Sequence, residues 1–207
     1  YKIHYKRIKN CYLRVEKGEV VIRCSPLFSQ SEIEKLIRNH QEEILEQIKG
    51  YVPKYNYQED GYVYLFNQKY QIVLKDMNIK KCAIHDRQIY VYSKNIQATT
   101  EMFLKQELMN YLKERIDFYL STSFHHVFPE IQIKKMKRRW GACFYQKNRV
   151  CFNLVLAHID YALIDYVIVH ELCHFLEANH SKAFYHEIEK RMPDYKERER
   201  LLKDVGI

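Results

Sequence analysis

The sequence is poor in glycine and proline, with 5 and 4 of them among 207 residues, and no long tract is rich in glycine, proline or serine. Tracts of that kind form linkers between independent domains. Their absence predicts one compact unit or two subdomains packed closely together. No internal repeat or low-complexity segment interrupts the chain.

The chain also lacks the uninterrupted apolar run of about 18 residues that a membrane-spanning helix requires. Its basic start, residues 1–7, is not followed by an apolar stretch or a small-residue cleavage site, so we expect no signal peptide. The six cysteines contain no CxxC pair and read as reduced thiols. These absences together predict a cytoplasmic protein with no membrane contact.

Positive charge is in excess, with a formal net charge of +8 at pH 7. Such a balance permits contact with nucleic acid or an acidic partner but does not decide a fold. The densest basic run consists of Lys134, Lys135, Lys137, Arg138 and Arg139. We favour a solvated face for this run, and a nucleic-acid contact is the alternative.

The first half of the chain alternates between strand and helix patterns. Residues 1–24 predict two strands around a tight turn at 17–18. Ser31 with Glu34 three residues later has the pattern of a capping box, which predicts a helix ending at Gly50. A polar connection over 51–61 and further strands over 62–92 complete an N-terminal α+β subdomain, predicted to span residues 1–95.

The second half, residues 96–207, is predicted to form the second domain. Thr100 is expected to cap a helix that ends near residue 126, and Asp160 to cap another over 161–177. The second helix is apolar almost all round, which is typical of a buried helix. The remaining expected elements are strands over 131–137, 141–144 and 150–156, a turn at 147–148, and helices over 181–191 and 194–203.

The sequence His170-Glu171-Leu172-Cys173-His174 lies inside this buried helix. The i, i+4 spacing puts both imidazoles on one helix face, where they reach a single ion. Glu171 lies beside them, placed to take a proton from a metal-bound water. Burying three such groups without partners costs several kcal/mol, so we interpret the motif as a zinc site with an open position.

A catalytic zinc site needs a third protein ligand, and the chain offers several. His180 follows His174 by six residues, and a turn through a left-handed Asn179 would return it to the metal. The rivals are a carboxylate further on, Asp194 or Glu197, and His186, which we expect on the surface. We favour His180.

Beyond this motif, the sequence resembles the YgjP-like metallopeptidases, which are related to the WLM and SprT-like (Spartan) zinc proteases. The resemblance rests on four segments, which together cover about residues 130–207. These are Arg139-Trp140-Gly141-Ala142-Cys143, the strand 150–154, the segment from Asp165 to His174, and Asn179-His180-Ser181 with Phe184 and Pro193-Asp194-Tyr195.

The resemblance implies an α+β fold whose zincin-like part packs the HExxH helix on a small, mostly antiparallel sheet, after a small N-terminal strand-helix region. It implies one Zn²⁺ per chain held by His170, His174 and His180, with Glu171 as general base in the hydrolysis of a protein or peptide. Two alternatives remain open. One is a nucleic-acid-associated protein with conditional proteolysis of DNA-bound proteins, and the other is a non-catalytic zinc-binding regulator.

The sequence also suggests roles for several neighbouring residues. Trp140 reads as a core anchor rather than a substrate contact. The strand 150–154 is a candidate to hold substrate as an added strand, with Asn153 orienting a site residue. Tyr185, His186 and Tyr195 are all within chain reach of the site as oxyanion donors, and nothing chooses among them. Cys173 reads as a packing residue.

Overall fold

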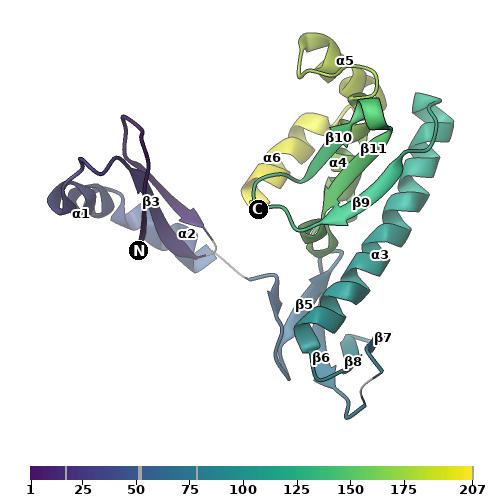
Figure 1. The fold of residues 1–207 in the computed structure, drawn as a ribbon, viewed down its shortest axis with the longest axis horizontal. Helices are drawn as coiled ribbons and strands as arrows, with labels where there is room; N and C mark the ends of the chain where they lie inside the picture. Colours follow the sequence, from purple (N-terminus) through teal and green to yellow (C-terminus); the bar gives the residue numbers. More distant parts are fainter. Residues whose placement is uncertain (17, 51–52, 78, 207) are drawn as a thin grey trace. The chain divides into compact units, whose positions relative to one another are not determined.

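The computed structural model describes residues 1–16, 18–50, 53–77 and 79–206, and it divides the chain into two compact units, Tyr1–Pro53 and Lys54–Ile207 (Figure 1). The boundary between these units lies at Pro53, whereas the predicted division lies at residue 95. The five-stranded sheet that follows Pro53 shares its core with the C-terminal helices, which is why it belongs to the second unit. The division at residue 95 stays a prediction about function.

The first unit is a three-stranded sheet with two helices. Its elements are β1 (Lys2–Tyr5), β2 (Tyr12–Glu16), β3 (Glu19–Cys24), α1 (Gln30–Asn39) and α2 (Gln41–Gly50). The predicted hairpin is present as the antiparallel pair of β2 and β3, although Lys17 of its turn lies outside the described residues. β1 is a strand that the prediction did not separate, and it runs parallel to β3. Ile22, Cys24 and Ile33 form the core of this unit.

The helix predicted from Ser31 to Gly50 is wrong in two respects. Its cap is Ser29, whose hydroxyl accepts from the Glu32 N–H while its own N–H donates to the Glu32 carboxylate over 2.8 Å. The S-x-x-E pattern occurs twice here, and the chain uses the earlier copy. The helix also breaks at His40, whose φ of −113° is not helical, so α1 and α2 are separate.

A five-stranded sheet begins the second unit. It consists of β4 (Tyr55–Asn56), β5 (Tyr62–Leu65), β6 (Gln68–Leu74), β7 (Lys81–His85) and β8 (Gln88–Tyr92), in the order β4-β5-β6-β8-β7. The strands predicted over 62–92 are therefore confirmed, and β4 forms within the predicted polar connection. Val63 on β5, Ile72 on β6 and Val91 on β8 are fully buried in the main core of this unit.

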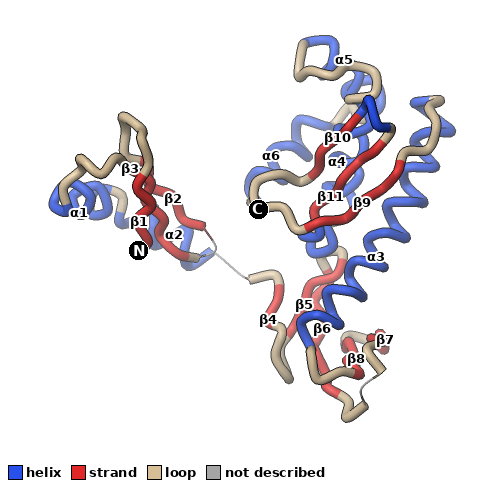
Figure 2. Tube along the Cα trace, viewed as in Figure 1, coloured by secondary structure: helices blue, strands red, loops and turns tan. Residues whose placement is uncertain are grey.

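Helix α3 (Ile96–Tyr119) begins earlier than predicted. Asn95 caps it by accepting from the Ala98 N–H over 3.0 Å, so the prediction of Thr100 as the cap is wrong. Thr100 lies one turn inside the helix and is fully buried. The helix continues as a single π turn, Leu120–Phe124, and ends at His125, whose φ is +50°. This long helix spans the side of both sheets in the second unit (Figures 1 and 2).

The sheet beside the HExxH helix has three strands, β9 (Glu130–Lys134), β10 (Gly141–Phe144) and β11 (Arg149–Asn153), in the order β10-β11-β9. β10 pairs antiparallel and β9 pairs parallel with β11, so the sheet is evenly mixed rather than mostly antiparallel. The predicted turn is present, with Asn148 at a φ of +43°. The third strand ends at Asn153, because residues 154–158 form a 3₁₀ helix.

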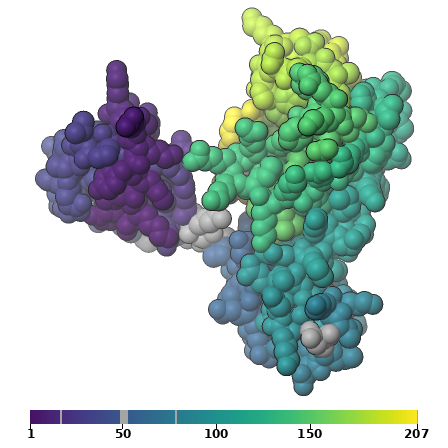
Figure 3. All heavy atoms as spheres, viewed as in Figure 1, coloured from purple at the N-terminus to yellow at the C-terminus, as the bar shows by residue number. Residues whose placement is uncertain are grey.

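The last three helices are α4 (Tyr161–Cys173), α5 (Lys182–Arg191) and α6 (Tyr195–Val205). α4 contacts α3, α5, α6 and β10, and ten of its thirteen residues are buried. This confirms the prediction of a buried helix and of an α+β fold. In Figure 3 the atoms of the second unit run from blue at its start to yellow at its C-terminal end. No helix in the described part of the chain is long and apolar enough to cross a membrane.

Candidate metal centre

Helix α4 brings two histidines and a glutamate to one end of the second unit. Asp160 caps the helix as predicted, accepting from the Ala162 N–H over 2.8 Å. The helix ends at Cys173, with His174 as its last residue in the helical region at φ −66°, so it is shorter than the predicted 161–177. The i, i+4 geometry still holds between His170 and His174, whose ring centroids are 5.2 Å apart.

His180 joins these two imidazoles from the segment after the helix. The ligand-competent atoms of His170, His174 and His180 all lie within 4.8 Å of one another. The Nε2 atoms of His170 and His180 are 3.0 Å apart, and the rings of His174 and His180 are 4.9 Å apart between centroids. The fold therefore brings His180, six residues after His174, back to the two helix histidines, and the three imidazoles form one cluster.

The turn that returns His180 differs from the one predicted. Neither Asn179 nor Ala178 has a positive φ, so the expected left-handed turn is wrong. The chain instead unwinds through short-range hydrogen bonds, from Leu176 N–H to the Cys173 carbonyl and from Ser181 N–H to the Asn179 carbonyl. His174 Nδ1 lies 3.3 Å from the Glu177 carbonyl, which ties the ring to this turn. Each step stays in ordinary backbone conformations because the reversal is spread over several residues.

Phe184 supports the three imidazoles from below. Its fully buried ring lies 5.0, 4.6 and 4.7 Å from the rings of His170, His174 and His180. The side chain is placed by α5, whose first turn is capped by Ser181, with the Phe184 N–H donating to the Ser181 hydroxyl. Ser181, which directly follows His180, thus also positions the Phe184 ring against the three imidazoles.

The environment keeps the helix histidines uncharged. Burial, together with His174 and His180 nearby, lowers the pKa of His170 to about 3. Burial and the neighbouring His180 also lower the pKa of His174. A neutral imidazole has the lone pair that a metal ligand needs.

Glu171 is held between α4 and β10. Its side chain is 5% exposed, and burial raises its pKa to about 8, opposed by a hydrogen bond from the Cys143 backbone N–H and by the charge of Arg139. Gly141 faces it so closely that a Cβ there would come within 2.5 Å of Glu171 Oε1. The carboxylate therefore occupies a space that a residue without a side chain leaves open.

The predicted rivals for a third ligand lie elsewhere. Asp194 accepts from Arg198 Nε over 2.8 Å at the start of α6. Glu197 and His186 are exposed. In the described part of the chain, the only group of three or more histidine, cysteine or acidic residues close enough to share an ion is the His170, His174 and His180 cluster.

The cluster fits a metal ion. The Nε2 atoms of His170 and His180 are 3.0 Å apart. When neither nitrogen carries a proton, their lone pairs repel, and a cation bound between them removes this repulsion. Three neutral nitrogen donors in one hemisphere are the ligand set that Zn²⁺ accepts while keeping a position open.

The prediction that strand 150–154 holds substrate is wrong. β11 is the central strand, paired on both sides, so its main-chain groups are already used. β10 is at the edge of this sheet among the described residues, and it is the strand against Glu171. Asn153 does orient part of the site, but through the loop before β10: its side-chain N–H groups donate to the Met136 and Arg139 carbonyls, each over 2.8 Å.

The other residues singled out by sequence lie in the main core or pack against it. Trp140 is half-buried and packs against the main core, as predicted. The rings of Tyr185 and His180 are 6.3 Å apart, and Tyr185 stacks on Tyr195 at 6.2 Å. Cys173 is fully buried with a pKa raised to about 12 by burial, so its thiol stays protonated and packs.

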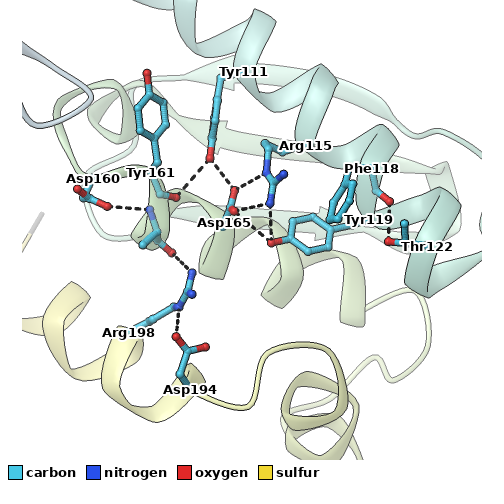
Figure 4. Close-up of polar contacts among 11 residues, drawn as sticks. Tyr111, Arg115, Phe118, Tyr119, Thr122, Asp160, Tyr161, Asp165, Asp194 and Arg198 are labelled. Atoms are coloured by element: carbon cyan, nitrogen blue, oxygen red, sulfur yellow. Dashed lines mark hydrogen bonds and ion pairs between the residues drawn. The ribbon is translucent and has the colours of Figure 1, made fainter.

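Sequence reasoning missed the polar network that ties α4 to α3 (Figure 4). Asp165, 8% exposed, accepts from Tyr111 (2.8 Å), from Arg115 through two nitrogens (3.1 and 2.7 Å) and from Tyr119 (3.1 Å). A carboxylate outside the HExxH motif, in an otherwise apolar stretch of the helix, was the available signal, because a buried charge needs partners. The network therefore holds α4, the helix that carries His170, against α3.

The chain is similar to one known family over nearly its whole length. The family described as YgjP-like, metallopeptidase domain, matches residues 9–205. No curated protein matches. Among solved structures, the metallopeptidase zymogen abylysin of Pyrococcus abyssi is similar at 17% identity and a TM-score of 0.42, over 45% of this chain and 94% of that one. The zymogen jannalysin of Methanocaldococcus jannaschii is similar at 25% identity and a TM-score of 0.42, over 46% and 90%. Scores of this size do not by themselves assign a function.

Proposed function

The chain belongs to the YgjP-like metallopeptidase family, a family of peptide-bond hydrolases, and from this premise we propose that it cleaves protein or peptide substrates with one zinc ion per chain. The observation that carries the proposal is the meeting of three imidazoles, from His170, His174 and His180, beside the buried carboxylate of Glu171. All six cysteines are free, and we propose a cytoplasmic location on that basis.

His170, His174 and His180 are the proposed zinc ligands. Two come from α4 and the third from the turn after it, so the site depends on the helix end as well as on the helix. When bound, zinc supplies a Lewis acid that polarises a carbonyl oxygen and makes water a good nucleophile near pH 7. Phe184 under the three rings limits their rotation and excludes water from that side.

Glu171 is the proposed general base. It is the neighbour of His170 on α4, so its carboxylate lies at the same helix end as the cluster. The Cys143 N–H and the close approach of Gly141 orient it. In the proposed reaction a carboxylate oxygen of Glu171 takes the proton of the attacking water and passes it to the leaving amine.

The edge strand β10 is the proposed place for the substrate backbone. An extended peptide that adds to an edge strand gains main-chain hydrogen bonds whatever its sequence, which suits an enzyme that acts on unfolded segments. Since β10 also contacts Glu171, a peptide on its open side lies beside the base.

The test measures the zinc content and the cleavage activity of the same protein sample. Purified protein should hold one zinc per chain by mass spectrometry of metals, should cleave an unfolded protein, and should lose both with a chelator. Glu171→Gln should keep the zinc and lose about 10²–10⁴-fold in rate, because the amide has the same shape and cannot take a proton. Cleavage at the wild-type rate by this variant would disprove the role of Glu171.

The same assay separates the two alternatives. Zinc binding without cleavage of any unfolded protein or peptide would favour the non-catalytic regulator. Cleavage only when DNA is added would favour the nucleic-acid-associated protein. Equal cleavage with and without DNA supports the simple peptidase.

A further inference from the structure

The loop over residues 135–140, which joins β9 to β10, carries a group of unpaired cations. Lys137, Arg138 and Arg139 are exposed, and none of the three makes an ion pair with a described residue. Lys135 differs from them, because its ammonium group lies 2.6 Å from the Glu101 carboxylate. Three adjacent positive charges that form no ion pair repel one another, so an anionic partner would be stabilised there.

The backbone of this loop is fixed from inside the protein. The side chain of Asn153 is fully buried and donates to the carbonyls of Met136 and Arg139, while its oxygen accepts from the Met136 N–H over 3.2 Å. The Asn153 N–H donates to the Trp140 carbonyl over 2.8 Å. Hydrogen bonds to Asn153 therefore fix the backbone of the loop that carries these cations.

The loop also lies at the proposed active site. Arg139 precedes Gly141 by two residues, and Gly141 is in contact with Glu171. Lys137, Arg138 and Arg139 come shortly before β10 in the chain, so they lie beyond the Gly141 end of the edge strand on which the substrate backbone is proposed to bind.

We propose that Lys137, Arg138 and Arg139 form a subsite for acidic side chains, so that the enzyme prefers peptide segments with Asp or Glu close to one side of the cleaved bond. This inference rests on the proposed peptidase function and names its substrate class. The preference comes from opposite charges in a partly exposed setting, where an ion pair adds modest affinity and sets which sequence binds.

The first experiment measures cleavage. A peptide library locates a bond that the zinc-loaded full chain cleaves, and fluorogenic peptides then carry a Glu, Gln or Lys pair before or after this bond. We expect the Glu pair on one side to raise kcat/KM about fivefold over Gln and the Lys pair to lower it, an effect that shrinks at high salt. The doubly substituted Lys137→Gln, Arg138→Gln protein should lose this preference, so that its kcat/KM becomes the same for the Glu, Gln and Lys peptides.

A matched control removes the same charge elsewhere. Lys105→Gln with Lys113→Gln takes two exposed lysines from α3 and should keep the full preference for the acidic peptide. Equal kcat/KM for the Glu, Gln and Lys peptides with the native protein would overturn the inference while leaving the peptidase function intact. Loss of the preference in both double variants would overturn it as well, because the effect would then come from net charge alone.

A binding measurement decides the matter independently of cleavage. Fluorescence anisotropy of the same labelled peptides with Glu171→Gln protein should give the same order, Glu tighter than Gln and Gln tighter than Lys, and this order should vanish when Lys137 and Arg138 are replaced. If no peptide is cleaved, the peptidase proposal is wrong. If the peptides also bind with equal affinity whatever their charge, the proposed subsite is wrong as well. If the loop variant instead loses affinity for a single-stranded oligonucleotide and keeps its peptide preference, the loop is a nucleic-acid surface and the inference is wrong.

Discussion

Gly141 on β10 lies against Glu171 on α4 with no room for a side chain between them. A Cβ at Gly141 would lie 2.5 Å from Glu171 Oε1 and 2.7 Å from its Cγ. The carboxylate cannot simply move aside, because Glu171 is 5% exposed and accepts from the Cys143 N–H. The edge strand of the sheet therefore sets the position of the proposed base.

Gly141→Ala should accordingly displace the Glu171 carboxylate and impair catalysis more than folding. A shift of about 1 Å at a catalytic group costs about 10²-fold in rate, and we expect a loss of that order in kcat/KM with the zinc content kept. Steady-state cleavage and metal analysis check this. Ala142→Ser, one residue along the same strand, is the control and should stay near the wild-type rate. Full activity in Gly141→Ala would show that the base tolerates displacement.

His180→Ala should remove most of the zinc, because the remaining imidazoles of His170 and His174 leave the ion with two protein ligands. Metal content after dialysis against a weak chelator measures the effect. His186→Ala, Asp194→Ala and Glu197→Ala are matched controls and should retain about one zinc per chain. Retention by His180→Ala together with loss in an acidic variant would move the third ligand to that residue.

Asn153→Ala should loosen the loop before β10 and destabilise the protein. The Met136 and Arg139 carbonyls would lose their donor in a buried setting, which costs about 1–3 kcal/mol for each such group. Denaturant unfolding gives the stability change, and hydrogen exchange at residues 135–140 reports the loop. Asn153→Asp keeps the acceptor for the Met136 N–H and loses both donors, so a stability equal to wild type in this variant would show that the donors are unimportant.

Asp165→Asn should destabilise the second unit without removing zinc at low temperature. The substitution leaves Arg115 with its planar guanidinium beside an uncharged amide, and breaking a buried pair of this kind costs about 3 kcal/mol. Thermal unfolding of the zinc-loaded protein measures the change. A melting temperature identical to wild type would mean that the network adds nothing to the packing of α3 on α4.

The tyrosines of this network make stability fall at alkaline pH. Burial and the hydrogen bond to Asp165 raise the pKa of Tyr111, and burial with the Asp165 charge raises that of Tyr119. A raised pKa means that the folded state holds the proton more tightly, so the contribution is complete below the unfolded value of about 10 and is lost as pH rises above it. Unfolding midpoints between pH 8 and 11 should decline above about pH 10, less steeply in Tyr111→Phe. Parallel curves for both proteins would contradict the assignment.

Local sequence determined the parts of the site that depend on neighbours along the chain. The helix cap at Asp160 and the facing of His170 and His174 follow from short-range spacing, because a helix repeats every 3.6 residues whatever surrounds it. The buried character of α4 follows in the same way from its apolar residues on all sides. Local patterns failed where two readings were equally good, as with the capping boxes at Ser29 and Ser31, or where a side chain just outside the apolar pattern capped the helix, as Asn95 did.

Tertiary structure decided what depends on contacts between distant segments. β11 is central rather than an edge because β9, some twenty residues earlier, pairs with it in parallel, and no periodicity in the strand itself encodes its neighbours. Asp165 finds its partners on α3 about fifty residues away, and Asn153 finds the carbonyls of a loop that precedes it. The position of His180 belongs with these: its residue type is in the sequence, but its approach to His170 depends on how α5 and Phe184 pack beneath the turn, since only packing selects one path among the many that six residues permit.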